Sequence, residues 1–168
     1  QEGRQPQLED FESLLLNMKL QISHRDWIEE RMYPCIYFNP DTVEIIDSGD
    51  IWLSETPFTP GSKSFESAFP RLCTWAQGIF TATNQPFLFI NVHLDHVKSS
   101  TRAEQIKVLI SETQKINPND NPIILCGDFN ESPFENVRDN IKSGYSHLNF
   151  GSVRIQSILE PSSLKPLK

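Results

Sequence analysis

Residues 87–96 read Phe-Leu-Phe-Ile-Asn-Val-His-Leu-Asp-His, an apolar stretch that becomes polar at its end. In a β-strand, alternate side chains point to opposite faces. One face here is aliphatic throughout: Leu88, Ile90, Val92 and Leu94. The other face begins with two phenylalanines and ends with Asn91, His93 and Asp95 in a row. The pattern predicts a strand that is buried on both sides and presents polar side chains only at its C-terminal end.

A second apolar stretch, residues 123–126, ends in Gly127-Asp128-Phe129-Asn130. An acid and an amide two residues apart point the same way from a strand end. The acid can bind a metal ion or orient a water molecule, and the amide can donate to a phosphate oxygen. Gly, Asp and Asn are also common in ordinary turns. A functional interpretation is favoured because a second buried strand ends in His93, with a helix between the two.

That helix is predicted over residues 101–116, where Thr101 and Glu104 fit a capping box and Asn117-Pro118 ends the pattern. Its apolar positions recur at helical spacing. The predicted buried stripe consists of Ala103, Ile106, Leu109, Ile110, Thr113 and Ile116. Strand, helix and strand in this order indicate a layered α/β architecture.

Shorter elements are predicted on either side of this unit. Leu8, Phe11, Leu15 and Met18 recur every three to four residues and predict a helix over residues 6–20. The remaining predictions are strands at 35–38, 43–46 and 51–53, a hairpin of 72–80 with 87–94, a short helix at 136–142, and irregular segments at 21–32 and 55–72.

The composition is that of one globular domain. The chain has 168 residues, 38% of them hydrophobic, and neither an internal repeat nor a domain boundary divides it. We therefore expect residues 1–168 to form a single domain. The longest apolar runs have the length of a strand, so no membrane span is predicted.

The charge balance limits the partners that the chain is expected to bind. Fifteen Lys and Arg against 22 Asp and Glu give a net charge of -7. This argues against a general nucleic-acid coat, which needs clustered cations to neutralise phosphates. An acidic surface remains compatible with a metal ion that in turn holds phosphate.

The three cysteines are predicted to be reduced residues of the core. Cys35, Cys73 and Cys126 are odd in number, far apart in sequence and set among apolar residues. Neither a disulfide framework nor a zinc cluster fits that spacing. Reduced cysteines favour an intracellular location.

Five blocks of the chain, in order, resemble the endonuclease/exonuclease/phosphatase superfamily, whose members include deoxyribonuclease I. The blocks are Gln1-Glu2 and residues 52–57, 70–76, 91–96 and 127–130. The resemblance implies an α/β fold of four layers, an α/β/β/α sandwich. It also implies metal-dependent hydrolysis of phosphate esters with Mg²⁺ as the cofactor and Mn²⁺ as the alternative.

The resemblance also implies roles for individual residues. Glu2 falls at the position of the family's metal-ligating glutamate. His93 matches the histidine that contacts the scissile phosphate, with Asn91 beside it as a candidate substrate-binding residue. Asp128 matches the aspartate that orients or activates the attacking water. Asn130 matches the amide that steadies the phosphate.

Arg71 is a further candidate for substrate binding. It stands in the block Pro70-Arg71-Leu72 before a predicted strand. Its guanidinium would add positive charge to the site, whereas a structural role in the long loop is equally compatible with the sequence.

Two parts of the family pattern are missing from this chain. Family members carry a strand with an asparagine before the Gln-Glu pair, and a Ser-Asp-His segment near their end. Gln156 stands where an aspartate is expected, and Glu30 lies one position from a match to an acid that pairs with the phosphate-contacting histidine. We therefore expect a sandwich that is incomplete at both ends, in a chain that is either a fragment of a longer protein or a truncated relative.

Three hypotheses for function follow. The first is a phosphodiesterase, nuclease or phosphatase acting on a small molecule, a lipid or a nucleic acid, with the acidic balance favouring a small or lipid-like substrate. The second is a catalytically incomplete relative that binds a phosphorylated ligand or a protein partner. The third is one chain of a split domain that a second polypeptide completes.

Overall fold

The computed structural model describes residues 2–21, 32–131 and 136–145. A four-stranded sheet in the order β5-β6-β7-β8 forms its centre. The pairings of β5 with β6 and of β6 with β7 are antiparallel, whereas β8 runs parallel to β7. The strands are β5 (Val43–Trp52), β6 (Leu72–Phe80), β7 (Gln85–His93) and β8 (Ile123–Asp128).

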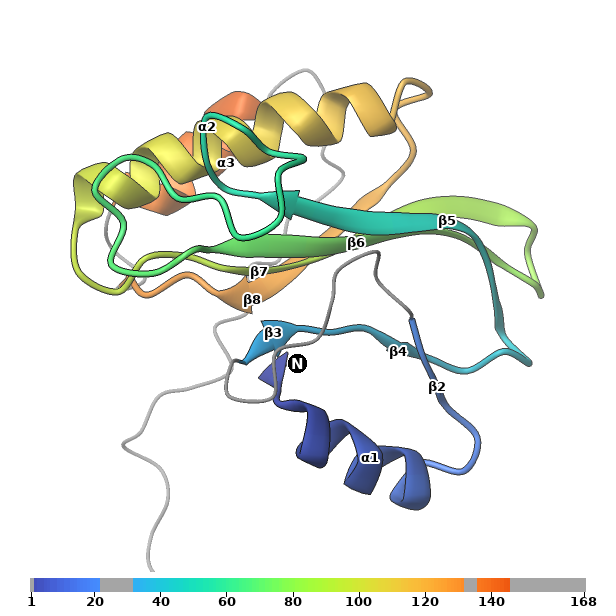
Figure 1. Ribbon diagram of the computed structural model, residues 1–168. Helices are drawn as coiled ribbons and strands as arrows, with labels where there is room; N and C mark the ends of the chain where they lie inside the picture. Colours follow the sequence, from blue (N-terminus) through green and yellow to red (C-terminus); the bar gives the residue numbers. More distant parts are fainter. Residues whose placement is uncertain (1, 22–31, 132–135, 146–168) are drawn as a thin grey trace, which may run out of the picture.

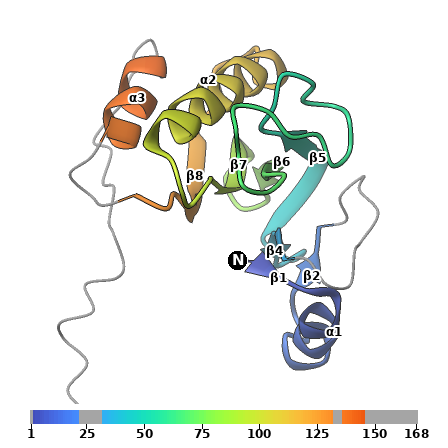
Figure 2. The ribbon, with the colours of Figure 1, turned by 60° about the vertical axis from the view of Figure 1, so that its left-hand side comes forward.

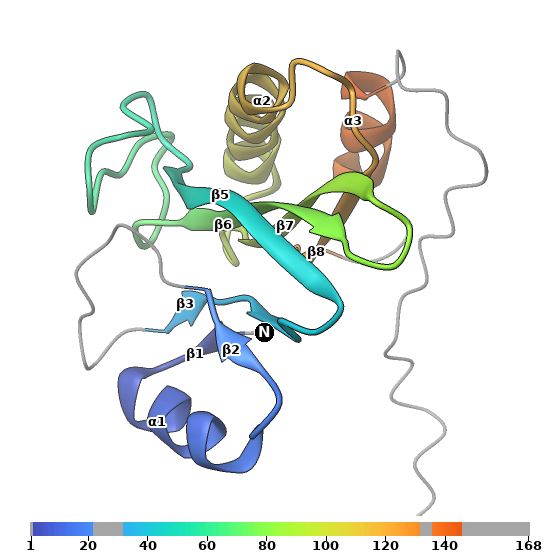
Figure 3. The same ribbon diagram turned by 90° about the vertical axis from the view of Figure 1, so that its right-hand side faces the viewer.

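Helices and short strands cover the two faces of this sheet. Two helices, α2 (Ser99–Ile116) and α3 (Asn136–Gly144), lie on one face (Figure 1). On the other face lie two short antiparallel pairs and then a helix (Figures 2 and 3). These elements are β1 (Glu2–Gly3) with β3 (Tyr33–Pro34), β2 (Lys19–Leu20) with β4 (Tyr37–Phe38), and α1 (Gln5–Leu14). The predicted sequence of layers, α/β/β/α, is confirmed.

The main hydrophobic core lies between the central sheet and α2. Burial of these side chains away from water is the principal force that holds the helix on the sheet. The fully buried members include Ile51, Leu88, Ile90, Val92, Leu94, Ile106 and Leu109. Phe87, on the other face of β7, is also buried. The prediction of a strand buried on both sides is therefore confirmed.

Helix α1 is shorter than the predicted 6–20. It ends at Leu14, and the chain then turns into strand β2. Leu8 is the only buried residue of this helix, whereas the leucines that close it, Leu14 to Leu16, are exposed. Leu15 and the leucine after it face solvent, so no core contact favours continuing the helix.

Strand β5 is continuous, whereas the sequence predicted two short strands or one strand broken around residues 48–50. The register shifts once, between Ile45 and Asp47, and pairing with β6 then continues to Trp52. Gly49, which suggested a break, lies opposite Trp75. A Cβ atom on Gly49 would meet the indole ring at 3.1 Å. The glycine therefore admits the tryptophan ring rather than ending the strand.

Helix α2 begins two residues before the predicted start, and the predicted capping box is wrong. Lys98 is the N-cap and makes no side-chain capping bond. Thr101 lies inside the first turn and donates its hydroxyl to the Phe65 carbonyl at 2.6 Å. The Thr101 hydroxyl is therefore bonded to the long loop before β6 and does not cap the helix.

The predicted strand at 35–38 is found only as β4, and the two-residue strands β1, β2 and β3 were not predicted, whereas the elements that follow β5 agree with the sequence. β6 and β7 form the predicted hairpin, β8 occupies the predicted apolar stretch and extends to Asp128, and α3 extends the predicted short helix to Gly144. No helix within the described ranges is long and apolar enough to cross a membrane. The expectations for Glu30 and Gln156 lie outside the described residues.

Candidate active site

The parallel pairing of β7 with β8 brings the two polar motifs together. In this register His93 lies opposite Asp128. Nε2 of His93 is 3.9 Å from Oδ2 of Asp128. The histidine side chain is 13% exposed and the aspartate side chain 53% exposed. The two groups therefore share one end of the sheet, with the carboxylate on the solvent side.

A tight turn fixes the residues that follow β8. Gly127 has φ +140°, and a Cβ atom there would lie 1.9 Å from the Val92 carbonyl oxygen, so only glycine fits. Oδ1 of Asp128 accepts a hydrogen bond from the Asn130 N–H at 2.8 Å. The Asn130 amide donates to the Leu94 carbonyl at 2.9 Å. Both candidate side chains are thus held against the end of β7.

Arg71 lies in the same place, immediately before β6. Its Nη1 is 2.9 Å from Nδ1 and 2.8 Å from Nε2 of His93, and its Nη2 is 3.1 Å from Nδ1 of His96. A guanidinium can only donate and a neutral imidazole has one acceptor nitrogen, so Nη1 donates to whichever His93 nitrogen carries no proton. This group places a permanent positive charge beside His93, in a form that suits phosphate recognition.

Asn91 supports the second layer of the fold. Its side chain is 1% exposed and donates to the Cys35 carbonyl at 2.9 Å. Its neighbour in the pairing of β6 with β7, Thr74, donates to the Pro34 carbonyl at 2.8 Å. These bonds hold the short strands against the central sheet. Substrate binding by Asn91 stays a prediction.

Glu2 reaches this region through its backbone. Strand β1 pairs Glu2 with Pro34, whose carbonyl is bound to the central sheet by Thr74. The side chain of Glu2 lies outside what the structure describes, so its role as a metal ligand stays a prediction.

Asp95 is a buried hydrogen-bonding centre to which the sequence analysis gave no role. It is fully buried. Its Oδ2 accepts from the Ala68 N–H at 2.8 Å and the Ser67 hydroxyl at 3.2 Å. Its Oδ1 accepts from the N–H groups of Val97 and Lys98 at 2.8 and 3.0 Å. One carboxylate therefore joins the loop before β6 to the segment after β7.

The hydrogen bonds to Asp95 outweigh its burial in setting its charge. Burial alone raises the pKa of this carboxyl, because a charged group is poorly solvated inside a protein. Donation by the N–H groups of Lys98, Ala68 and Val97 and by the Ser67 hydroxyl lowers it, and the resulting pKa is below the usual range. Asp95 is therefore a buried anion at neutral pH.

Helix α2 contributes two polar side chains to the same centre. Gln105 accepts from the Asp95 N–H at 2.8 Å and donates to the Ser67 hydroxyl at 3.2 Å. Arg102 donates to the Asp95 carbonyl at 3.3 Å and forms a buried ion pair with Glu131 at 3.4 Å. The signal in the sequence is that these two polar residues lie three apart on the face that also carries Ile106.

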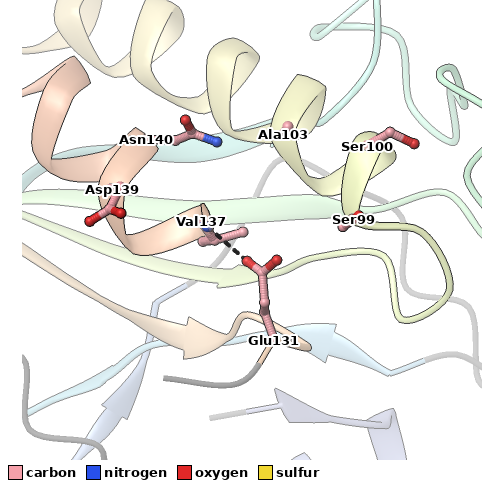
Figure 4. A pocket seen from close by; sticks show the side chains of 7 residues that line it. All are labelled: Ser99, Ser100, Ala103, Glu131, Val137, Asp139 and Asn140. Carbon is pink, nitrogen blue, oxygen red and sulfur yellow. Dashed lines mark hydrogen bonds between the residues drawn. The ribbon is translucent and has the colours of Figure 1, made fainter. Parts of the chain in front are cut away.

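One cavity lies apart from the strand ends. It has a volume of about 350 Å³ and lies between α2 and α3, where Glu131 accepts the Val137 N–H at 2.8 Å (Figure 4). Its lining residues are Ser99, Ser100, Ala103, Glu131, Val137, Asp139 and Asn140. None of the candidate site residues belongs to that lining.

The chemistry of the site suits a hard cation only in part. Within residues 2–21, 32–131 and 136–145, no group of three or more His, Cys, Asp and Glu is arranged to hold a metal ion. Asp128 supplies a carboxylate, the ligand type that Mg²⁺ prefers, at an accessible position. The described residues alone therefore do not make up a complete metal site.

The three cysteines are free thiols, as predicted. Cys35 and Cys73 are buried, and Cys126 is partly buried. Burial raises the pKa of the Cys73 and Cys126 thiols, which keeps them protonated and unreactive.

Known proteins share this fold and sequence. Residues 19–163 match the model of the Endonuclease/Exonuclease/phosphatase family. A crystal structure of a protein of that family from Bacteroides thetaiotaomicron superposes with a TM-score of 0.75 at 30% identity, covering 82% of this chain and 50% of that one. A mannosyl-6-phosphatase from Bacteroides thetaiotaomicron VPI-5482 superposes with a TM-score of 0.74 at 30% identity, covering 82% and 52%.

A third similar structure, a functionally unknown conserved protein from Enterococcus faecalis V583, is 34% identical with a TM-score of 0.65, covering 75% of this chain and 48% of that one. A search of curated proteins gives no match. The chain spans about half the length of the solved structures that it matches. The family match extends over most of the chain and agrees with the observed layers and strand order. The protein therefore belongs to the endonuclease/exonuclease/phosphatase family.

Proposed function

We propose that this chain is a domain, residues 1–168, of a hydrolase that cleaves phosphate esters. The observation that carries the proposal is the meeting of His93, Asp128 and Arg71 at the ends of adjacent strands. A carboxylate that can orient a water molecule, and an imidazole and a guanidinium that can bind phosphate, thus lie within a few ångströms of one another. Membership of the family supports the same reaction class.

In the proposed reaction, Arg71 and His93 bind the phosphate, and the guanidinium offers paired N–H donors to its oxygens. Asp128 accepts a hydrogen bond from a water molecule and aligns it for in-line attack. Asn130 steadies the phosphate with the amide hydrogen that Leu94 does not take. The bond from the water oxygen to phosphorus forms as the bond from phosphorus to the ester oxygen breaks.

We also propose that the domain binds Mg²⁺ through Glu2, with Mn²⁺ as an alternative. Carboxylate oxygens suit either cation. The pairing of β1 with β3, which is itself hydrogen-bonded to the central sheet, supports a position for Glu2 near the strand ends. When bound, the cation would neutralise charge on the phosphoryl group.

A small phosphorylated molecule is the proposed substrate. The 30% identical neighbour from Bacteroides thetaiotaomicron VPI-5482 is a mannosyl-6-phosphatase, which supports this class. The net charge of -7 also disfavours a long polyanion such as duplex DNA.

Phosphate release tests the proposal. The protein would be incubated with a phosphomonoester and a phosphodiester, in Mg²⁺, in Mn²⁺ and with a chelator. Asp128→Ala and His93→Ala are each expected to lower the rate about 100-fold or more. Asp10→Ala, which removes an exposed carboxylate on α1, is the matched control and is expected to leave the rate unchanged.

Other outcomes of this experiment separate the remaining hypotheses. Hydrolysis that persists in Asp128→Ala would contradict the proposed roles. A folded protein that binds phosphate but does not hydrolyse either ester would favour a phospho-ligand-binding module. Activity that appears only with a co-purified second chain would favour a split domain.

A further inference from the structure

An exposed aromatic pair lies beside the candidate site. The ring of Phe69 stacks on that of His96, with centroids 5.8 Å apart and an interplanar angle of 21°. Cζ of Arg71 is 5.9 Å from the Phe69 centroid, within the range of a cation–π contact. Phe69 nevertheless remains 57% exposed. A large apolar ring is therefore held in place and still presented to solvent.

Two loops hold this pair, and buried bonds fix both. Phe69 belongs to the loop before β6, where the Ser67 hydroxyl is 2.7 Å from the Phe69 carbonyl oxygen. His96 follows β7, next to Asp95. The Asp95 carboxylate accepts from Ala68 in the first loop and from Val97 in the second, both at 2.8 Å. Hydrogen bonds within the protein thus hold both loops in place, and a site that is already ordered loses less entropy on binding.

Two further contacts also hold the loop before β6 in place. Lys98 and Glu66 form an ion pair at 2.6 Å, and Thr101 donates to the Phe65 carbonyl at 2.6 Å. The first bond joins the loop before β6 to the start of α2, and the second joins it to the first turn of that helix. Phe69 is therefore exposed although the segment that carries it is held in place.

The guanidinium of Arg71 joins this pair to the phosphate position. One terminal nitrogen contacts His93 and the other contacts His96. If a phosphate ester binds with its phosphate at Arg71 and His93, a ring on its alcohol portion would be close enough to contact Phe69. An exposed aromatic face favours a flat partner or the C–H face of a saturated ring.

We propose that Phe69, with His96 behind it, is a stacking subsite for a ring carried by the alcohol portion of the phosphate ester. The inference rests on the proposed function, because the phosphate position comes from it. It goes further in naming a substrate class, phosphate esters of ring-bearing alcohols. Sugar rings and nucleobases share this chemistry.

Binding of four probes tests the subsite: inorganic phosphate, ethyl phosphate, cyclohexyl phosphate and phenyl phosphate. Affinities would be measured in Mg²⁺ by NMR titration of the full chain carrying Asp128→Ala, so that the esters are not hydrolysed during the measurement. Both ring esters are expected to bind more tightly than ethyl phosphate. Phe69→Ala is expected to lower the affinity for the ring esters, relative to ethyl phosphate, about five-fold. The affinity for inorganic phosphate is expected to stay unchanged.

Phe58→Ala is the matched control. Phe58 lies in the same irregular segment, is 70% exposed, and is expected to leave all four affinities unchanged. Both phenylalanines are largely exposed, so neither substitution removes a core side chain, and circular dichroism would verify folding. A preference for phenyl over cyclohexyl phosphate would indicate a flat base, and equal affinities would indicate a sugar ring.

Three results would overturn the subsite, and they are distinguishable. Ring esters that bind no tighter than ethyl phosphate, with inorganic phosphate still bound, would reject the subsite and retain the proposed function. Phe69→Ala lowering all four affinities equally would do the same. Loss of inorganic phosphate binding in the unsubstituted protein would reject both.

Discussion

Gly127 is the residue at which the candidate site depends most directly on backbone geometry. Its φ of +140° and the 1.9 Å approach of a Cβ atom to the Val92 carbonyl oxygen leave no room for a side chain. A larger residue there would push β8 away from β7 and separate Asp128 from His93. The turn after β8 is thus defined by steric exclusion as much as by hydrogen bonds.

Gly127→Ala is expected to lower the free energy of unfolding by about 3 kcal/mol, because strain and a backbone collision add. Urea denaturation would measure it. Gly61→Ala is the control: Gly61 also has positive φ, +74°, but a Cβ atom there meets nothing within 4 Å. That substitution is expected to cost only about 1 kcal/mol. Equal losses in the two variants would contradict the steric argument.

Asp95 gives the site a pH-dependent component of stability. Its folded pKa lies below the usual range, so its stabilising effect is present above the unfolded pKa of about 4. The effect is lost as the pH falls from there through the folded pKa. The asparagine side chain in Asp95→Asn cannot ionise. Its NH₂ group would replace one carboxylate oxygen and would face the groups that donate to Asp95. At pH 7 we expect it to cost about 3 kcal/mol.

Urea denaturation at pH 7, 5 and 3 would test this expectation. The difference between the unsubstituted protein and Asp95→Asn should be constant from pH 7 to 5 and smaller at pH 3. Asp10→Asn, on the exposed surface of α1, should show little difference at any of these pH values. A difference that grows on acidification would reverse the assigned sign.

At the scale of elements, the strands and helices that carry the site were predictable from local patterns. The alternation in residues 87–96 and the apolar run before Gly127 define β7 and the strand beside it, and neither pattern needs long-range information. The hairpin and α2 follow from the same reasoning. The sequence therefore places His93 and Asp128 at strand ends.

The remaining elements depend on contacts that the local sequence does not contain. Gly49 resembled a strand break because the indole ring opposite it comes from another strand. Thr101 resembled a helix cap because its acceptor, the Phe65 carbonyl, is far away in the sequence. The role of Asp95 was hidden for the same reason, since its donors Ala68 and Ser67 belong to a separate loop.

The attachment of α2 to the turn after β8 includes a buried ion pair that can be tested directly. Arg102 and Glu131 have side chains 7% and 3% exposed. Glu131→Ala would remove one carboxylate from the buried guanidinium, and we expect a loss of about 3 kcal/mol in urea denaturation.

The exposed pair on the same helix is the control for this experiment. Glu104 and Lys107 lie 2.7 Å apart on the surface, and Glu104→Ala is expected to cost less than about 0.5 kcal/mol. If the two alanine variants were equally stable, the Arg102 pair would not anchor α2.

On the scale of the whole molecule, a few bonds join the central sheet to the layer of short strands. Asn91 and Thr74 donate to the carbonyls of Cys35 and Pro34, and those strands in turn pair with β1 and β2. These hydrogen bonds stand beside a buried apolar cluster of Tyr33, Trp52 and Leu72, which also joins the two layers. This arrangement could not be read from the sequence, because Asn91 resembles a ligand-binding residue there.

Asn91→Ala is expected to loosen the layer of short strands by removing the buried amide that donates to the Cys35 carbonyl, at a cost of about 2 kcal/mol. Hydrogen exchange should become faster at the amides of residues 33–38, with β6 affected less. Asn119→Ala, in the exposed turn after α2, is the control and should leave exchange unchanged. Uniformly faster exchange throughout the chain would instead indicate a single inseparable core.

The parallel pairing of β7 with β8 also orders the events of folding. The hairpin of β6 and β7 closes over a turn of four residues, 81–84, and needs only local search. Asp128 reaches His93 only after the whole α2 crossover has closed, which carries a larger loop-closure entropy. The histidine is thus positioned early and the aspartate late. A chain emerging from the ribosome would have no paired acid and base until the crossover helix had docked.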